Sequence, residues 1–280
     1  MSGSAKVVVG ALGTALAIGS AGLACTPTGR GSGGTWPNEP SGFTLVSDYD
    51  FADAVPATNQ GAHLGRRGWQ VWYNIDGLGT RVSDSTAPQS PPYVLQFLYP
   101  IGMRDGGAPM TLEHDFTPPV TELYWGFWWK PSNPFQSDGS GVNKIVFIWT
   151  PTVSGNTTDL LYLDLSPTPW RIRCMNDLGT GGGPTAGQRL EPNATTTVIT
   201  LGQWHRIEIY VEYSTGSLAN GVVKWWVDGQ LNGTYTNLKM VQDGGFTHLQ
   251  FSPTYGGNQG DRKTENDYYW IDHVYLSRAP

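Results

Sequence analysis

Two short polar patterns contain the side chains best suited to proton transfer. His248 and Gln250 are two residues apart, and Arg206, Glu208 and Tyr210 follow the same spacing in an earlier segment. Side chains two apart in a β-strand point to the same face, so each pattern would present its members together. Histidine and tyrosine can exchange protons because protein surroundings tune their pKa values. We interpret these residues, with Tyr255 and Asn258 just beyond, as one candidate site.

The earlier pattern lies in a segment that predicts a β-hairpin. An alternating run from Trp204 to Tyr213 is followed by a turn at Ser214 to Gly221 and a second run from Val222 to Asp228. In the first run, one face is apolar and the other carries charged and aromatic side chains. Such a strand is half buried, which predicts an antiparallel sheet packed against a second sheet.

The hairpin and the end of the chain resemble a known family. Trp204-His-x-Ile-Glu, then Asn-Gly, then Trp226-x-Asp-Gly is similar to the late hairpin of concanavalin A-like jelly rolls, and Tyr268 to Ser277 is similar to their terminal strand. That group contains lectins, glucanases and polysaccharide lyases. The resemblance implies an all-β fold, a concanavalin A-like β-sandwich of two antiparallel sheets.

The resemblance also implies roles for the polar residues. Lyases of this fold use histidine, tyrosine, an amide and a basic residue on a concave sheet to cleave uronate polysaccharides by β-elimination. On that pattern Arg206 or Gln250 would neutralise the carboxylate, His248 would be the base, and Tyr210 or Tyr255 the acid. We expect substrate contacts from another set of side chains: Glu208, Trp128, Tyr124, Lys144 and Asn258.

Other functions remain open at the level of the sequence. Retaining glucanases of the fold carry Glu-x-Asp-x-x-Glu, and neither Glu113-His-Asp nor Glu265-Asn-Asp has the later glutamate, which argues against that chemistry. The aromatic side chains could instead mediate self-assembly of a non-enzymatic surface protein. We expect no required cofactor. One loop is rich in oxygen-bearing side chains and could be either solvated or the site of a structural calcium ion. Its polar residues are Asp261, Glu265, Asn266 and Asp267.

Composition is consistent with one folded domain and argues against one class of partner. The chain has 280 residues, with 37 glycines and 20 prolines that supply turns, and sandwiches of similar length are commonly single domains. Its formal net charge of -6 argues against a nucleic-acid partner, whose phosphates require a basic surface. The same charge weakens the case for a strongly anionic polymer, although a local basic groove can exist on an acidic protein. The partner that the resemblance implies is a polysaccharide.

The N-terminus predicts export. Residues 1–24 hold one lysine and then an apolar run typical of a secretory signal peptide. The end of the run fits either ordinary signal-peptide cleavage or lipid attachment at Cys25. We expect contact with a membrane only through such a lipid. Residues 25–42 have the composition of a flexible tether, and the folded domain is expected at 43–280. We place the protein outside the cell or on the cell envelope.

Overall fold

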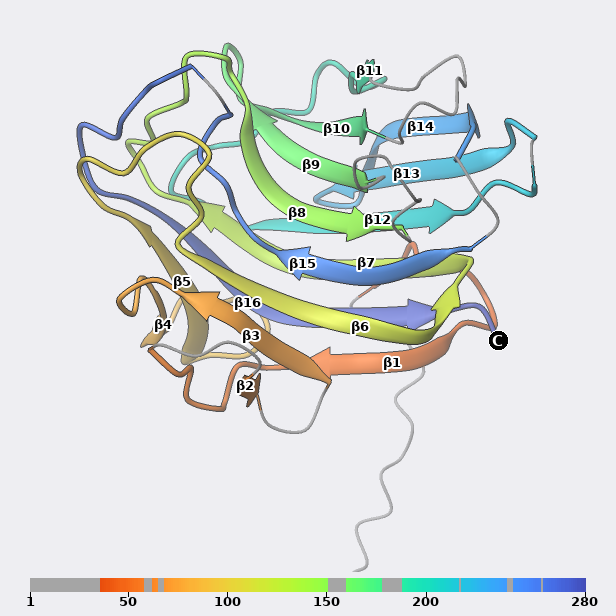
Figure 1. Cartoon of the computed structure of the whole chain (residues 1–280), viewed down its shortest axis with the longest axis horizontal. Helices are drawn as coiled ribbons and strands as arrows, with labels where there is room; N and C mark the ends of the chain where they lie inside the picture. The colour runs from red at the N-terminus through yellow and green to blue at the C-terminus, as the bar shows by residue number, and fades with distance from the viewer. Residues whose placement is uncertain are drawn as a thin grey trace, which may run out of the picture.

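The computed structural model describes residues 36–57, 62–64, 68–150, 160–177, 188–216, 218–240, 244–257 and 259–280. These residues form two eight-stranded antiparallel sheets, which confirms the predicted β-sandwich. Figure 1 looks onto one sheet with the other behind it. In the described ranges, no helix has the length and apolar character needed to cross a membrane.

The first sheet, sheet A, has the order β14-β13-β12-β7-β16-β5-β4, with β1 also paired to β16. The predicted hairpin is its β12-β13 pair, and a further strand, β14, extends it into a meander. The strands of sheet A are β1 (Thr44–Tyr49), β4 (Gly79–Ser83), β5 (Tyr93–Tyr99), β7 (Glu122–Pro131), β12 (His205–Glu212), β13 (Gly221–Val227), β14 (Gln230–Leu238) and β16 (Asp267–Arg278).

The second sheet, sheet B, has the order β11-β10-β9-β8-β15-β6-β3-β2. Its centre is formed by segments far apart in the sequence, because β15 lies between β8 and β6. The strands of sheet B are β2 (Ala62–Leu64), β3 (Trp69–Asn74), β6 (Met110–Val120), β8 (Asn143–Trp149), β9 (Leu160–Ser166), β10 (Arg171–Asp177), β11 (Gln188–Leu190) and β15 (Phe246–Phe251).

One core lies between the sheets and is rich in large aromatic side chains. Trp125 and Phe127 on β7 pack against Phe251 on β15, with ring centroids 4.8 and 5.1 Å apart. Inward and outward positions alternate along each strand, so every strand that fills the core also presents a second set of side chains on an outer face. The two outer faces, one on each sheet, are the surfaces available for a site.

The outer face of sheet A is partly covered by residues that precede the first strand. Trp36 is 3% exposed and packs with Tyr124 and Tyr275. Residues 36–42 fall in the range predicted to be a flexible tether, yet they lie against the sheet. The folded domain therefore begins at least as early as Trp36.

Gly126 makes this packing possible, because a Cβ atom there would overlap the ring of Trp36. Gly126→Ala is therefore expected to displace the ring and to lower the free energy of unfolding by about 1–3 kcal/mol, as over-packing does. Urea denaturation would measure the loss. In a Trp36→Ala background the same substitution should cost much less, and an equal cost in both backgrounds would contradict this account.

Candidate functional site

The residues predicted to form one site lie on opposite outer faces of the sandwich. Arg206, Glu208 and Tyr210 are on β12, which pairs with β7 and β13 in sheet A. His248 and Gln250 are on β15, which pairs with β6 and β8 in sheet B. The hydrophobic core separates the two groups. The expectation that they form one cluster is wrong, because their strands belong to different sheets.

On sheet A the predicted residues bond to one another and to the N-terminal segment. Glu208 is 0% exposed; its Oε1 accepts a hydrogen bond from Arg206 Nε at 2.9 Å, and Tyr124 and Asn38 donate to its Oε2. Tyr210 donates to two carboxylates at the end of the same face. Glu208 and Tyr124 are buried, so a ligand cannot reach them in this arrangement.

Three further residues predicted to belong to the site, Trp128, Tyr255 and Asn258, do not share one environment. Trp128, on the outer face of sheet A, is half-buried and donates its indole N–H to Gln89. Tyr255 follows β15 and is 1% exposed, with its hydroxyl accepting a hydrogen bond from Gln136 at 3.3 Å. Asn258 lies outside the described residues.

The outer face of sheet B brings polar and aromatic side chains from many strands into rows. Cross-strand partners in an antiparallel sheet are neighbours on the same face. Asp115, His248 and Trp149 form one such row. A second row runs across the sheet from β3 to β11 and consists of Gln70, Glu113, Gln250, Phe147, Tyr162, Met175 and Arg189.

Hydrogen bonds fix the orientation of Gln250 in the second row. Its Oε1 accepts the indole N–H of Trp149 at 2.9 Å, so its amide nitrogen points to the carboxylate of Glu113. Gln70 donates to both Glu113 and Asp115, at 3.1 and 2.7 Å. Burial raises the pKa of the Glu113 carboxyl, and the charge of Asp115 raises it further. The two carboxylates are thus held close together by amides.

His248 is placed at the edge of this network. Its ring stacks on Trp149 with centroids 5.5 Å apart and planes 16° apart, and its Nε2 lies 4.0 Å from Glu113 Oε2. Desolvation lowers the pKa of His248 below its ordinary value of 6.5, although Asp115 partly opposes this effect. The imidazole is therefore neutral near pH 7 and able to accept a proton.

Lys144 and Tyr162 are neighbours at the centre of the same face. Lys144 Nζ donates to the carbonyl of Gly256 at 2.8 Å and lies 5.7 Å from the centroid of the Tyr162 ring. Both side chains are half-buried. Sequence reasoning included Lys144 but missed Tyr162, although its alternation with Leu161 and Leu163 in β9 indicates an outward position.

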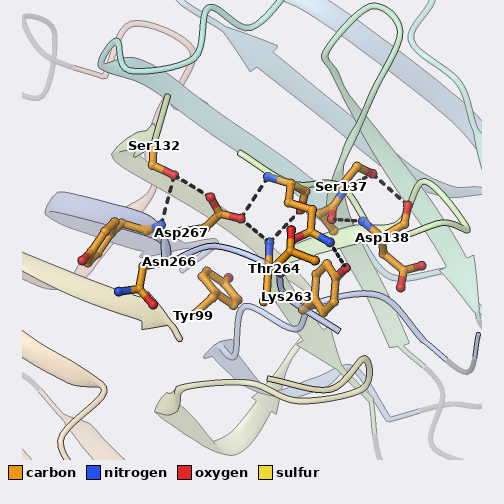
Figure 2. A network of polar contacts seen from close by, with 12 residues as sticks. Tyr99, Ser132, Ser137, Asp138, Lys263, Thr264, Asn266 and Asp267 are labelled. Atoms are coloured by element: carbon orange, nitrogen blue, oxygen red, sulfur yellow. Dashed lines mark hydrogen bonds and ion pairs between the residues drawn. The ribbon is translucent and has the colours of Figure 1, made fainter. Parts of the chain in front are cut away.

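The loop predicted to be a candidate calcium site contains a buried ion pair. Lys263 Nζ lies 2.6 Å from Asp267 Oδ2, and neither side chain is exposed. Figure 2 shows this pair with the hydroxyl of Ser132, which also contacts Asp267. A lysine ammonium thus occupies the position beside this carboxylate. Within the ranges that the structure describes, no group of three or more His, Cys, Asp or Glu side chains is arranged to hold a metal ion.

Several solved structures that superpose on this chain are polysaccharide lyases. Alginate lyase Aly36B, in a mutant form bound to an alginate trisaccharide, superposes with a TM-score of 0.61 at 14% identity, covering 85% of this chain and 100% of that one. An alginate lyase from Aplysia kurodai gives a TM-score of 0.61 at 14% identity, covering 84% of this chain and 99% of that chain.

A glucuronan lyase from the fungus Trichoderma reesei gives a TM-score of 0.54 at 16% identity, covering 79% of this chain and 94% of that chain. No protein-family model and no curated protein matches the sequence. The chain therefore has a jelly-roll β-sandwich, a fold that these polysaccharide lyases share. At these identities the likeness establishes the fold alone.

Proposed function

We propose that this protein binds a uronate-containing polysaccharide on the outer face of sheet B and cleaves it by β-elimination. The observation that carries the proposal is the pairing of Lys144 with Tyr162 on a face that also presents the rings of Trp149 and His248. Aromatic rings pack against the C–H surfaces of sugars, and the cation and hydroxyl supply polar chemistry beside them. The fold shared with lyases supports the same conclusion.

The chemistry needs a cation close to a proton-transfer group. In our proposal the Lys144 ammonium pairs with the uronate carboxylate and stabilises the negative charge that develops when the C5 proton leaves. A base takes that proton, the C4–O bond breaks, and the departing oxygen receives a proton. The products are an unsaturated uronate and a new chain end, so atoms balance without water or a cofactor. In our proposal the hydroxyl of Tyr162 is the proton-transfer group, because Tyr162 lies close enough to Lys144 for both side chains to contact the same sugar.

His248 is a second candidate for the base, as the sequence suggested, because it is neutral at pH 7. It lies on β15, two strands away from Tyr162 on β9, which corresponds to about 10 Å across the sheet. One sugar ring cannot contact both side chains at that separation. We therefore assign proton transfer to Tyr162 and sugar stacking to the His248–Trp149 pair.

The cellular setting remains as the sequence predicts it. The apolar run before Cys25 supports export, with or without a lipid, and an exported protein would meet polysaccharides outside the cell. We retain this location as part of the proposal.

A direct test is to incubate the full-length protein with alginate, polyglucuronate and neutral glycans and to follow the ultraviolet absorbance of unsaturated products. We expect products from at least one uronate polymer. Lys144→Ala should abolish them and weaken binding of the same polymer, whereas Lys224→Ala on the outer face of sheet A should do neither. Binding without products in the wild-type protein would leave a lectin-like module. No binding from a self-associating sample would favour the assembly alternative.

A further inference from the structure

A β-bulge in β3 places two aromatic side chains on the outer face of sheet B. Val71 on β3 pairs with Leu112 on β6 and is fully buried in the core. The next pair joins Tyr73 to Thr111, so Trp72 is an extra residue. The two residues of a bulge oppose one partner residue, and bulges often redirect a side chain beside a functional site. Trp72 is 51% exposed, so its ring is open to a ligand.

This ring lies at the end of a row that contains Lys144. The hydroxyls of Thr111 on β6 and Ser252 on β15 are 2.7 Å apart, so these residues are neighbours across the sheet. The next strand is β8, where the main-chain N–H of Lys144 donates to the carbonyl of Thr254 at 3.0 Å. The row therefore crosses β3, β6, β15 and β8, which lie side by side in Figure 1. From Trp72 to Lys144 it spans three strand spacings, or about 14 Å.

Uncharged side chains lie between the two ends of this row. Ser252 is half-buried, so a ligand can reach it, while Thr111 beside it is 2% exposed. The carboxylate of Glu113 belongs to the neighbouring row, where the amide of Gln250 donates to it. A sugar that lies over Ser252 can therefore exchange hydrogen bonds with a hydroxyl, and the row itself adds no charge between its two ends.

Beyond Lys144 the row is closed in the other direction. Asp164 on β9 pairs with Lys144, and Arg173 on β10 pairs with Asp164. Asp164 is 0% exposed and Arg173 is 6% exposed, and the two side chains form an ion pair with each other. A ligand bound at Lys144 therefore cannot contact the next two positions of this row. The accessible direction along the row is toward β3.

We propose that Trp72 forms a distal sugar-binding subsite, so that the glycan bound at Lys144 lies across β8, β15, β6 and β3. This inference rests on the proposed function and extends its site, because the span from Lys144 to Trp72 is longer than one sugar ring. The indole face packs against the C–H surface of a sugar, and the half-buried ring of Tyr73 lies beside it. The His248–Trp149 pair lies in a different direction from Lys144, along β8, and contacts other sugars of the same chain.

The test measures binding of the disaccharides and hexasaccharides of alginate and of polyglucuronate by calorimetry. The full-length protein carries Tyr162→Phe, which removes the hydroxyl that we assign to proton transfer, so that cleavage does not interfere. Adding Trp72→Ala should weaken hexasaccharide binding by about tenfold, as expected for the loss of one aromatic contact. The disaccharide is too short to reach Trp72 from Lys144, so its affinity should not change. Trp72→Phe keeps a ring and should retain most of the hexasaccharide affinity.

The matched control is Tyr93→Ala, which removes a 38% exposed aromatic ring from β5 of sheet A and should change neither affinity. Unchanged hexasaccharide binding in Trp72→Ala, or an equal loss for the disaccharide, would overturn this inference alone. An equal loss in Tyr93→Ala would overturn it too, because the effect would not depend on the face of sheet B. If no hexasaccharide binds before Trp72 is changed, the proposed function fails as well, so the two failures can be told apart.

Discussion

Tyr162→Phe is expected to lower kcat for the proposed elimination by about 10²–10⁴-fold while KM changes little. The substitution removes only the hydroxyl, and a positioned acid or base contributes a factor of this size. The aromatic ring, its packing against Phe147 and the cation of Lys144 all remain. Steady-state rates of unsaturated product formation, measured with saturating polymer, would give the change.

The matched control is Tyr210→Phe, which removes a hydroxyl from the outer face of sheet A and should leave kcat unchanged. His248→Ala separates the two candidate bases. If His248 only stacks on sugar, its loss should raise KM and leave the pH profile of kcat in place. If His248 is the base, kcat should fall and the acid limb of the profile, which its lowered pKa puts below pH 6.5, should disappear. A fall in kcat for His248→Ala, together with an active Tyr162→Phe variant, would contradict the assignment of proton transfer to Tyr162.

Asp267→Ala is expected to cause the largest loss of stability. The Lys263 ammonium is fully buried, 4.1 Å from the ring centroid of Phe135 and 4.2 Å from that of Tyr255. Burial lowers the pKa of Lys263, and contact with Asp267 opposes that change. Removing the carboxylate leaves a buried charge without a counter-ion, with only the carbonyl of Gln136 still accepting a hydrogen bond from it, which costs about 3–5 kcal/mol. For a domain of this size Tm would fall by roughly 6–20 °C.

Urea and thermal denaturation would measure this loss. The double variant Lys263→Met/Asp267→Leu should recover most of the stability, because apolar side chains suit the aromatic surroundings and no charge remains buried. A single Asp267→Ala variant that loses less than about 1 kcal/mol would show that the ammonium finds another partner or that water reaches it.

Several features of the fold follow from the sequence alone. The alternation of Trp204 to Tyr213 predicts a half-buried strand, and the Asn-Gly and Asp-Gly turns predict the hairpin that the structure contains. Local chain geometry explains this success, since strand period and turn residues depend on neighbours in the sequence. The terminal strand, expected at Tyr268 to Ser277 from its resemblance to the last strand of jelly rolls, is β16.

The composition of the site could not be predicted in this way. Alternation shows that Arg206 and Tyr210 share a face, and that His248 and Gln250 share a face, but not which sheet each strand joins. Both sheets have a polar outer side and an apolar inner side, so their strands carry the same signature. Long-range pairing placed β12 beside β7 and β15 between β8 and β6.

The same pairing decided which residues now form the candidate site. Tyr162 had no distinctive motif around it, and its meeting with Lys144 depends on the contact of β9 with β8. Glu208 and Tyr124 looked accessible in the sequence, yet residues 36–42 cover their face. The sequence by itself therefore determined the strands, the turns and the sandwich. Only the tertiary structure decided which outward side chains meet, because those contacts join segments that local patterns cannot relate.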